Sequence, residues 1–302
     1  MRIGVAATPD VAIPTLDWLF SSEHEVALAI TQPDKPAGRG RVIKQSVVGE
    51  WASSHDVPVL KPASSEELIG RINDLDCIVT IGYGVLLPQH ILDLPKFGFI
   101  NLHFSLLPAY RGAAPAQRAL QNGETSTGVS VFQLEKGMDT GPVYSQRSIA
   151  IDPNWRSTEL LQALAQEGPA AVRDALNMIS QGESPIAQQG EVSLAPKITK
   201  QEAFLDFSKD SKTLVNAIRA FTYEPGAWCM WKKESFKITS AVVVESEPAS
   251  PAEIVVDDQR VIVACGSKSS IELLTVVPAG KKEMSAADWA RGARLQSGES
   301  FD

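Results

Sequence analysis

The sequence predicts an α/β protein: a Rossmann-like, doubly wound and mostly parallel sheet, followed by a small C-terminal antiparallel β-barrel of the OB-like type. Apolar runs alternate with helical segments over residues 1–182, which is typical of a parallel sheet with helical crossovers. A polar stretch rich in Gly, Pro and Ser follows at 183–203 and predicts a linker. Short β-rich runs then crowd residues 204–302. We therefore expect a first domain at 1–182, a linker at 183–203 and a second domain at 204–302.

The first domain opens with an apolar run that predicts a strand at 2–8. Asp10 and Pro14 then predict the start of a helix that ends near Ser21. Later apolar runs predict strands at 24–31, 57–60, 77–81, 99–102, 128–134 and 142–151. Helical patterns lie near 46–54, 65–73 and 113–121, and at 157–181 as one long helix or a pair. The turn GVAATPD lacks the G-x-G-x-x-G fingerprint, so the sequence does not predict a bound dinucleotide.

The second domain begins with one predicted helix at about 208–221. Five β-rich runs predict its strands: AWCMW at 227–231, FKITSAVVV at 236–244, AEIVVDD at 252–258, RVIVAC at 260–265 and IELLTVV at 271–277. Short strands at this density favour a small antiparallel barrel. Such barrels often bind oligonucleotides, although a fold alone does not assign a function.

Composition narrows the class of protein. A hydrophobic content of 44% and a charged content of 21% are typical of a soluble globular enzyme. No run of 18 apolar residues occurs and the start resembles a strand rather than a signal peptide, so we expect a cytoplasmic protein. The net charge of -8 argues against a surface wrapped throughout in nucleic acid. Cys77, Cys229 and Cys265 form no C-x-x-C pair, which favours buried thiols over disulfides or a zinc site, and we expect no metal.

The run GFINLHFSLLPAYRGAAP at 98–115 is the most informative part of the chain. Asn101 and His103 stand two residues apart at the end of a predicted strand, so their side chains share one face. A second polar group, Asp139, stands in a turn between Gly137 and Gly141. An amide, an imidazole and a carboxylate at strand ends indicate carbonyl chemistry, with an oxyanion donor, a proton carrier and an orienting acid.

Two further segments carry weaker signals. Gly82 and Gly84 end a predicted strand and allow a ligand to approach the backbone, although a tight turn explains them equally well. The segment KPAGRGRVIK contains four cations and no acid, and forms a basic patch that can dock an RNA backbone: Lys35, Arg39, Arg41 and Lys44.

These residues carry a family resemblance. The run NLHFSLLPAYRGAAPAQRAL resembles the signature of the folate-dependent formyltransferases. The match is closest to the branch that acts on methionyl-tRNA, and it rests on TPDVA, TQPDKPAGRGR, RGAAP, GMDTG and PAGKKEMS. The resemblance covers essentially the whole chain. It implies 10-formyltetrahydrofolate as formyl donor, initiator methionyl-tRNA as acceptor, and a monomer that binds no membrane and needs no metal.

The resemblance also implies roles for individual residues. The catalytic three are Asn101, His103 and Asp139. The folate site is formed by Ser105, Leu106, Leu107 and Pro108, with backbone at Gly82, Tyr83, Gly84 and Leu87 and at 135–139 around the pteridine. The tRNA contacts are Lys35, Arg39, Arg41 and Lys44, and the second domain adds an RNA-binding surface. Phe104 stands where many relatives have Gly, which bears only on local packing.

The expected reaction is attack of the methionine α-amine on the formyl carbon, with the oxyanion stabilised by Asn101 and His103 and proton transfer aided by Asp139. Two alternatives remain open. One is a related formyltransferase that acts on a small amine, such as an amino sugar or a purine precursor. The other is a folate-binding or RNA-binding homologue without catalysis.

Overall fold

A computed structural model of the chain describes residues 1–37, 42–245 and 250–302. The chain forms two compact units, which we call the first and second units. The first unit comprises residues 1–115, 126–150 and 161–196, and the second comprises 116–125, 151–160 and 197–302. Most of the predicted linker, residues 183–196, therefore belongs to the first unit.

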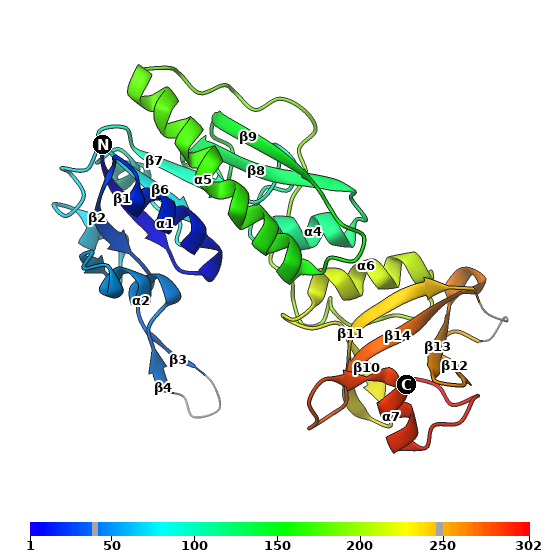
Figure 1. Cartoon of the computed structure of the whole chain (residues 1–302). Helices are drawn as coiled ribbons and strands as arrows, with labels where there is room; N and C mark the ends of the chain where they lie inside the picture. Colours follow the sequence, from blue (N-terminus) through cyan, green and yellow to red (C-terminus); the bar gives the residue numbers. More distant parts are fainter. Residues whose placement is uncertain (38–41, 246–249) are drawn as a thin grey trace. The chain divides into compact units, whose positions relative to one another are not determined.

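The first unit is built on a seven-stranded sheet in the order β5-β2-β1-β6-β7-β8-β9 (Figure 1). Its strands are β1 (Arg2–Ala7), β2 (Glu25–Ile30), β5 (Val59–Leu60), β6 (Cys77–Ile81), β7 (Phe99–His103), β8 (Ser126–Gln133) and β9 (Val143–Ala150). The pairs from β5 to β7 are parallel, whereas β8 runs antiparallel to both β7 and β9. The predicted Rossmann-like, mostly parallel sheet is confirmed, with an antiparallel edge.

The sheet has a topological switch point between β1 and β6, because the chain moves outward from β1 to β2 and then returns to the other side of β1. Ligands of open α/β sheets bind beyond the carboxyl ends of strands at such a point. The carboxyl ends of β6 and β7 hold Gly82 and His103, respectively, so the fold brings both predicted site segments to one edge.

The helices of the chain are α1 (Ile13–Ser21), α2 (Val47–Ser54), α3 (Gln89–Leu92), α4 (Pro115–Gln121), α5 (Ser157–Gln181), α6 (Ser211–Phe221) and α7 (Ala286–Ala293). Short 3-10 helices lie at Asp10–Ala12, Ser65–Leu68 and Gly266–Lys268. The predicted helix at 65–73 is wrong beyond the single turn Ser65–Leu68, because the backbone becomes extended at Ile69, with a ψ of 131°. Gly70 follows with a φ of 75°, and the two residues form a turn instead. Among the described helices, none is long and apolar enough to cross a membrane.

The core of the first unit lies on both faces of the parallel strands. The residues of β6 and almost all of β1 are buried, as expected for a parallel sheet covered on two sides. In Figure 1, α5 runs alongside β8 and β9. Its Gly168 permits close packing against α1 and β7, since a Cβ there would lie 2.4 Å from the hydroxyl of Thr15 and 2.8 Å from Leu102.

The second unit holds the predicted antiparallel sheet, which is confirmed, in the order β10-β11-β14-β13-β12 with β15 beside β14. Its strands are β10 (Trp228–Trp231), β11 (Glu234–Val244), β12 (Ile254–Asp257), β13 (Arg260–Cys265), β14 (Ser269–Val277) and β15 (Met284–Ser285). An additional helix, α7, was not predicted from the sequence, and it packs on β13 and β14. The signal was present, because Ser285 caps this helix by accepting a hydrogen bond from the Asp288 N–H.

The C-terminal residues contact both end strands of this sheet. The Phe301 N–H donates to the Ala252 carbonyl before β12, and the Asp302 N–H donates to the Met230 carbonyl in β10. The Phe301 ring is 3% exposed and packs within an aromatic cluster of Phe207, Trp231, Phe236 and Trp289. Backbone pairing and aromatic burial together cover edges that an open sheet would expose.

The basic segment contains an element that the sequence analysis missed, the hairpin β3 (Lys35–Ala37) and β4 (Val42–Lys44). Lys35 and Lys44 are direct cross-strand partners at its base. The other two predicted tRNA contacts, Arg39 and Arg41, lie outside the described residues.

Candidate active site

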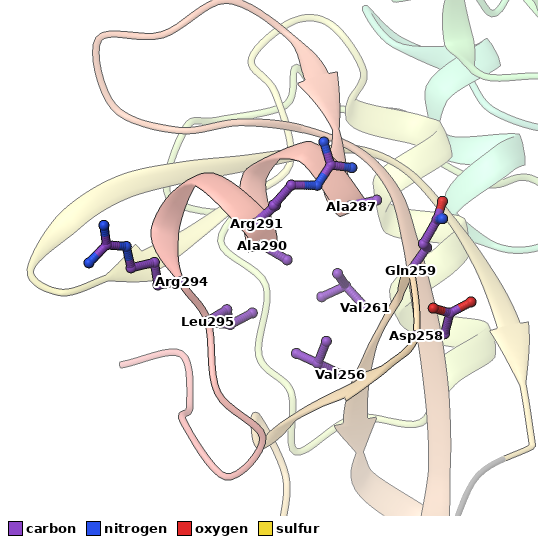
Figure 2. Close-up of a pocket in the computed structure, with 9 residues that line it drawn as sticks. All are labelled: Val256, Asp258, Gln259, Val261, Ala287, Ala290, Arg291, Arg294 and Leu295. Atoms are coloured by element: carbon purple, nitrogen blue, oxygen red, sulfur yellow. The ribbon is translucent and has the colours of Figure 1, made fainter.

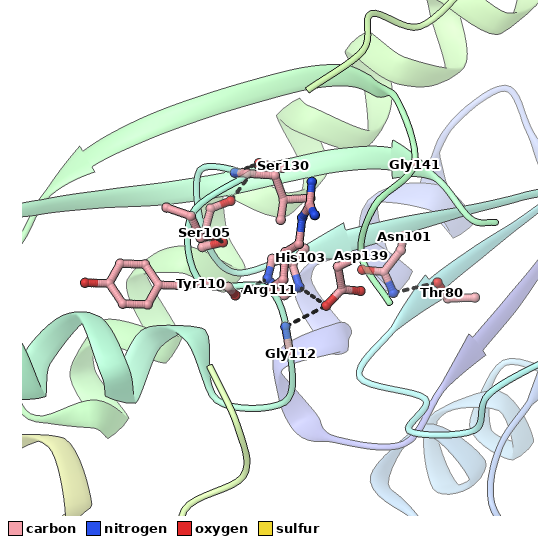
Figure 3. A network of polar contacts seen from close by, with 12 residues as sticks. Thr80, Asn101, His103, Ser105, Tyr110, Arg111, Gly112, Ser130, Asp139 and Gly141 are labelled. Atoms are coloured by element: carbon pink, nitrogen blue, oxygen red, sulfur yellow. Dashed lines mark hydrogen bonds and ion pairs between the residues drawn. The ribbon is translucent and has the colours of Figure 1, made fainter. Parts of the chain in front are cut away.

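β7 presents Asn101 and His103 on one face, as the alternation of a strand requires. Asn101 is half-buried, and the His103 ring is 6% exposed and meets the edge of Phe132. Figure 3 shows both side chains close to Asp139, which comes from the turn between β8 and β9. The fold therefore brings together the amide, the imidazole and the carboxylate that the sequence predicts.

Thr80, on the neighbouring strand β6, orients the Asn101 amide. Its Oγ1 accepts a hydrogen bond from Asn101 Nδ2 at 2.8 Å and donates one to the Ile100 carbonyl at 3.0 Å. Nδ2 carries two hydrogens, so this bond leaves one N–H of Asn101 available to a ligand. A held amide with a free N–H is a pre-organised hydrogen-bond donor.

The His103 imidazole has a defined tautomer. Its Nε2 lies 2.9 Å from the Tyr110 carbonyl, which can only accept, so Nε2 carries the proton. Burial lowers the pKa of His103, and the Asp139 carboxylate and the Tyr110 hydrogen bond only partly oppose this. The imidazole is therefore neutral near pH 7, and its Nδ1 lone pair faces Asp139 Oδ2 at 3.8 Å.

Asp139 is held in an unusual backbone conformation. Its φ of 53° lies in the left-handed region, which a residue with a side chain rarely occupies. The carboxylate accepts a hydrogen bond from the Gly112 N–H at 2.7 Å, which ties this turn to the loop after β7 (Figure 3). Strained backbone at a polar site is a common property of functional sites.

The predicted folate segment after β7 is tightly packed. Ser105, Leu107 and Pro108 are buried, and Leu106 is half-buried. The Ser105 hydroxyl donates to the Ala109 carbonyl at 2.6 Å, so it is a turn-forming group rather than a nucleophile. The other predicted folate segment, at the end of β6, offers backbone. Gly82 and Gly84 are exposed, whereas the Tyr83 ring packs in the core beside the half-buried Leu87.

Gly82 is required at its position. Its φ is 56°, and a Cβ would lie 2.7 Å from the Pro9 ring after β1. The next carbonyl, that of Tyr83, accepts a hydrogen bond from Gln32 Nε2 at 2.8 Å. The Gln32 oxygen in turn accepts from Lys35 Nζ at 2.6 Å, which connects the predicted folate turn to the base of the basic hairpin.

A separate pocket of about 210 Å³ lies in the second unit, between α7 and the β12–β13 turn (Figure 2). Its lining combines aliphatic side chains with two arginines: Val256, Asp258, Gln259, Val261, Ala287, Ala290, Arg291, Arg294 and Leu295. It contains none of the predicted site residues. Within residues 1–37, 42–245 and 250–302, no cluster of three or more His, Cys, Asp or Glu side chains is placed to hold a metal ion.

Sequence reasoning missed several residues that hold this site, among them Thr80, Tyr110, Gly112 and Gln188. Thr80 looks like an ordinary strand residue, and Tyr110 and Gly112 contribute only backbone atoms to the site. Gln188 lies in the polar stretch that predicts a linker. No local pattern distinguishes these residues, because Thr80, Gly112 and Gln188 act on groups 21, 27 and 49 residues away. Tyr110 acts on the nearer His103, but only through a carbonyl that every residue carries.

Comparison with known proteins identifies the family to which the chain is similar. The family model described as "Formyl transferase" matches residues 1–176, and "Formyl transferase, C-terminal domain" matches residues 197–294. A methionyl-tRNA formyltransferase of Salinispora tropica is 41% identical over 306 residues, covering 99% of this chain and 99% of its own.

Two solved structures are similar in fold at low sequence identity. An N-formyltransferase from Helicobacter canadensis, in complex with folinic acid and dTDP-3-aminofucose, has a TM-score of 0.69 at 17% identity, over 90% of this chain and 98% of its own. A methionyl-tRNA formyltransferase from Clostridium thermocellum has a TM-score of 0.56 at 16% identity, over 88% of this chain and 100% of its own.

Proposed function

Because the chain belongs to the formyl transferase family, we propose that it transfers a formyl group from 10-formyltetrahydrofolate to the methionine α-amine of initiator methionyl-tRNA. This reaction prepares the tRNA for translation initiation. One observation carries the proposal: an amide, a neutral imidazole and a carboxylate converge at the end of β7. The choice of acceptor rests on the full-length similarity to a methionyl-tRNA formyltransferase.

Asn101 is the proposed oxyanion donor. When the amine attacks the formyl carbon, the formyl oxygen gains negative charge, and the free N–H of Asn101 can donate to it. Thr80 holds the amide in place, so little reorganisation is needed as the charge develops. Removing one donor of this kind typically costs about 10²–10³ in rate.

His103 and Asp139 are the proposed proton acceptors. The imidazole Nδ1 and the carboxylate Oδ2 are both acceptors, and they lie 3.8 Å apart. An N–H group placed between them can donate to either, so this pair can bind the α-amine and take the proton it loses on attack. The lowered pKa of His103 keeps its lone pair available at neutral pH. The proton then passes to the folate nitrogen as the tetrahedral intermediate collapses.

The folate donor is proposed to lie against the backbone at Gly82, Gly84 and Leu87 and along 105–108. Gly82 and Gly84 are exposed, whereas the Tyr83 ring is buried, so contacts at this turn would use main-chain groups. Residues 135–139 would border the pteridine from the other side. The Helicobacter canadensis structure supports folate as the donor, because that relative was solved with folinic acid.

The basic hairpin is proposed to contact the acceptor tRNA. Lys35 and Lys44 are exposed and directly opposite each other, an arrangement of like charges that is unfavourable in the absence of a partner. A phosphate near both ammonium groups would relieve this repulsion. Arg39 and Arg41 are included on sequence grounds alone. We also propose that the region 204–302 supplies a second RNA surface, and that the enzyme acts as a cytoplasmic monomer.

The test identifies the product. The protein is incubated with 10-formyltetrahydrofolate and either initiator methionyl-tRNA or a nucleotide-linked 3-amino sugar, and each acceptor is analysed by mass spectrometry. We expect N-formylmethionine after hydrolysis of the tRNA ester. Formyl transfer to the amino sugar alone would favour the small-amine alternative, and no transfer to either acceptor would favour a non-catalytic homologue.

A further inference from the structure

The segment at 186–195 runs across both loops that carry the site. Ile186 and Val143, which begins β9, exchange two backbone hydrogen bonds of 2.7 and 2.8 Å. Farther along, the Arg111 N–H donates to the Ser193 carbonyl at 2.9 Å, and the Ala195 N–H donates to the Arg111 carbonyl at 2.7 Å. One segment thus pairs with the start of β9, four residues after Asp139, and with the loop after β7.

Gln188 lies between these two sets of backbone bonds, and its amide is fully used. Nε2 donates to the carbonyls of Asp139 and Gly141, each at 2.8 Å. Oε1 accepts from Arg111 Nε at 3.2 Å and from the Arg111 terminal nitrogen at 2.7 Å. The orientation of the amide is unambiguous, because a flipped amide would set oxygen against two carbonyls and NH₂ against a guanidinium.

The groups that Gln188 holds are the ones that place His103 and Asp139. Arg111 stands between Tyr110, whose carbonyl accepts from His103, and Gly112, whose N–H donates to Asp139. Both Asp139 and Tyr110 have positive φ, 53° and 61° respectively. Residues with side chains keep this conformation only where their surroundings hold them. Gln188 bonds directly to the backbone of Asp139, and it bonds to the side chain of Arg111, the neighbour of Tyr110.

We propose that Gln188 is a positioning residue for the transfer reaction, which fixes the Asp139 carboxylate against the His103 imidazole by joining their two loops. This inference rests on the proposed function of the site. Gln188 itself does not touch the reacting atoms. Loss of its amide would leave the Gly112–Asp139 hydrogen bond as a link between the two loops, but would free the Asp139 carbonyl and the Arg111 guanidinium. A displacement of about 1 Å at reacting groups can cost on the order of 10²-fold in rate.

The test compares Gln188→Ala and Gln188→Glu with Gln189→Ala, a matched control at the exposed neighbouring position. Glutamate keeps the length of the side chain and the oxygen facing Arg111, but removes both N–H donors. It gives the same test of kcat if Gln188→Ala proves unstable. We expect kcat to fall about 10- to 100-fold in both Gln188 variants, with the KM for folate within about twofold of the parent and Gln189→Ala unchanged.

A second readout is independent of activity. The His103 imidazole is titrated by NMR in the parent, Gln188→Ala and Gln189→Ala, with Asp139→Asn marking complete loss of the carboxylate charge. Asp139 and the Tyr110 carbonyl both raise the His103 pKa, so displacement of either loop lowers it in Gln188→Ala. Gln188→Glu adds a negative charge that itself raises the pKa, so that variant is assessed by kcat alone. The other charged groups on these loops face elsewhere: Arg111 contacts Gln188, Glu135 accepts from Thr140, and Lys136 is exposed.

The two readouts separate this inference from the proposed function. An unchanged His103 pKa in Gln188→Ala, or a kcat of either Gln188 variant equal to that of Gln189→Ala, would overturn the positioning role while leaving the transfer reaction intact. A parent protein that transfers no formyl group would instead refute the proposed function, and the NMR titration would still decide whether Gln188 positions Asp139.

Discussion

Replacement of Thr80 by Val tests whether a held amide at Asn101 is needed for transfer. The Thr80 side chain is 2% exposed, and its hydroxyl makes both the 2.8 Å contact with Asn101 and the 3.0 Å contact with Ile100. Valine has nearly the same shape but no hydroxyl, so one N–H of Asn101 loses its partner. The cost to stability should be about 1–3 kcal/mol, the usual penalty for an unsatisfied buried polar group.

The transfer rate should also fall, because the amide that Thr80 holds is the proposed oxyanion donor. An unheld Asn101 amide can rotate away from the formyl oxygen, and the full loss of an oxyanion donor costs about 10²–10³ in rate. Because the amide remains present in Thr80→Val, we expect a smaller reduction in kcat, roughly 10- to 100-fold. The KM for folate should change little, since the hydroxyl points to Asn101 and the backbone.

The assay is steady-state formylation of charged initiator tRNA, with Thr80→Ser as the control. Serine retains the hydroxyl and loses only a methyl group, so it should keep most of the parent kcat. Circular dichroism at the assay temperature establishes that each variant is folded. If Thr80→Val transfers the formyl group as fast as Thr80→Ser, the oriented-amide account of Asn101 is wrong.

Four further predictions address the remaining parts of the account. His103→Ala should lower kcat about 10²–10⁴-fold with folate still bound in equilibrium titration; near-parental turnover would remove its proposed role. Burial lowers the His103 pKa and the neutral form is the active one, so kcat/KM should fall on the acid side with an apparent pKa below that of an ordinary histidine. An apparent pKa above the ordinary value would contradict this assignment. Phe301→Ala should destabilise the second unit by about 3–5 kcal/mol in urea unfolding, whereas a change below about 1 kcal/mol would show that the aromatic cluster closes without it. Replacing Lys35 and Lys44 together by Ala should weaken tRNA binding and reduce its salt dependence by about two phosphate contacts; an unchanged salt slope would exclude the hairpin as an RNA contact.

The sequence predicts the parts of the fold that local pattern controls. Buried parallel strands such as 77–81 are almost wholly apolar, with Thr80 the one polar residue of that strand, and the two-residue alternation places Asn101 and His103 on one face of β7. The predicted helix at 65–73 is wrong because the chain turns at Ile69 and Gly70, and the hairpin within 35–44 was missed because Gly and Pro there favour a loop. The direction of β8 depends on pairing across the sheet, which apolar runs do not encode.

The contacts that complete the site could not be predicted from local sequence patterns, and the reason is physical. Gln188 acts on the carbonyl of Asp139, 49 residues away, and Thr80 acts on an amide 21 residues away. Each interaction requires the folded backbone to bring its two groups within hydrogen-bond distance. A polar stretch such as 183–203 therefore resembles a solvated linker in the sequence, even though its Gln188 donates hydrogen bonds to the carbonyls of Asp139 and Gly141.

The most direct test of the central claim is the ratio of kcat/KM for initiator methionyl-tRNA to that for a nucleotide-linked amino sugar. Both acceptors are measured in one preparation with saturating 10-formyltetrahydrofolate, and His103→Ala serves as the blank. The account predicts a ratio of at least about 10³, because the tRNA offers contacts to the basic hairpin and the second unit that a small acceptor cannot make. A ratio near or below one would contradict it and assign the enzyme to the small-amine branch of the family.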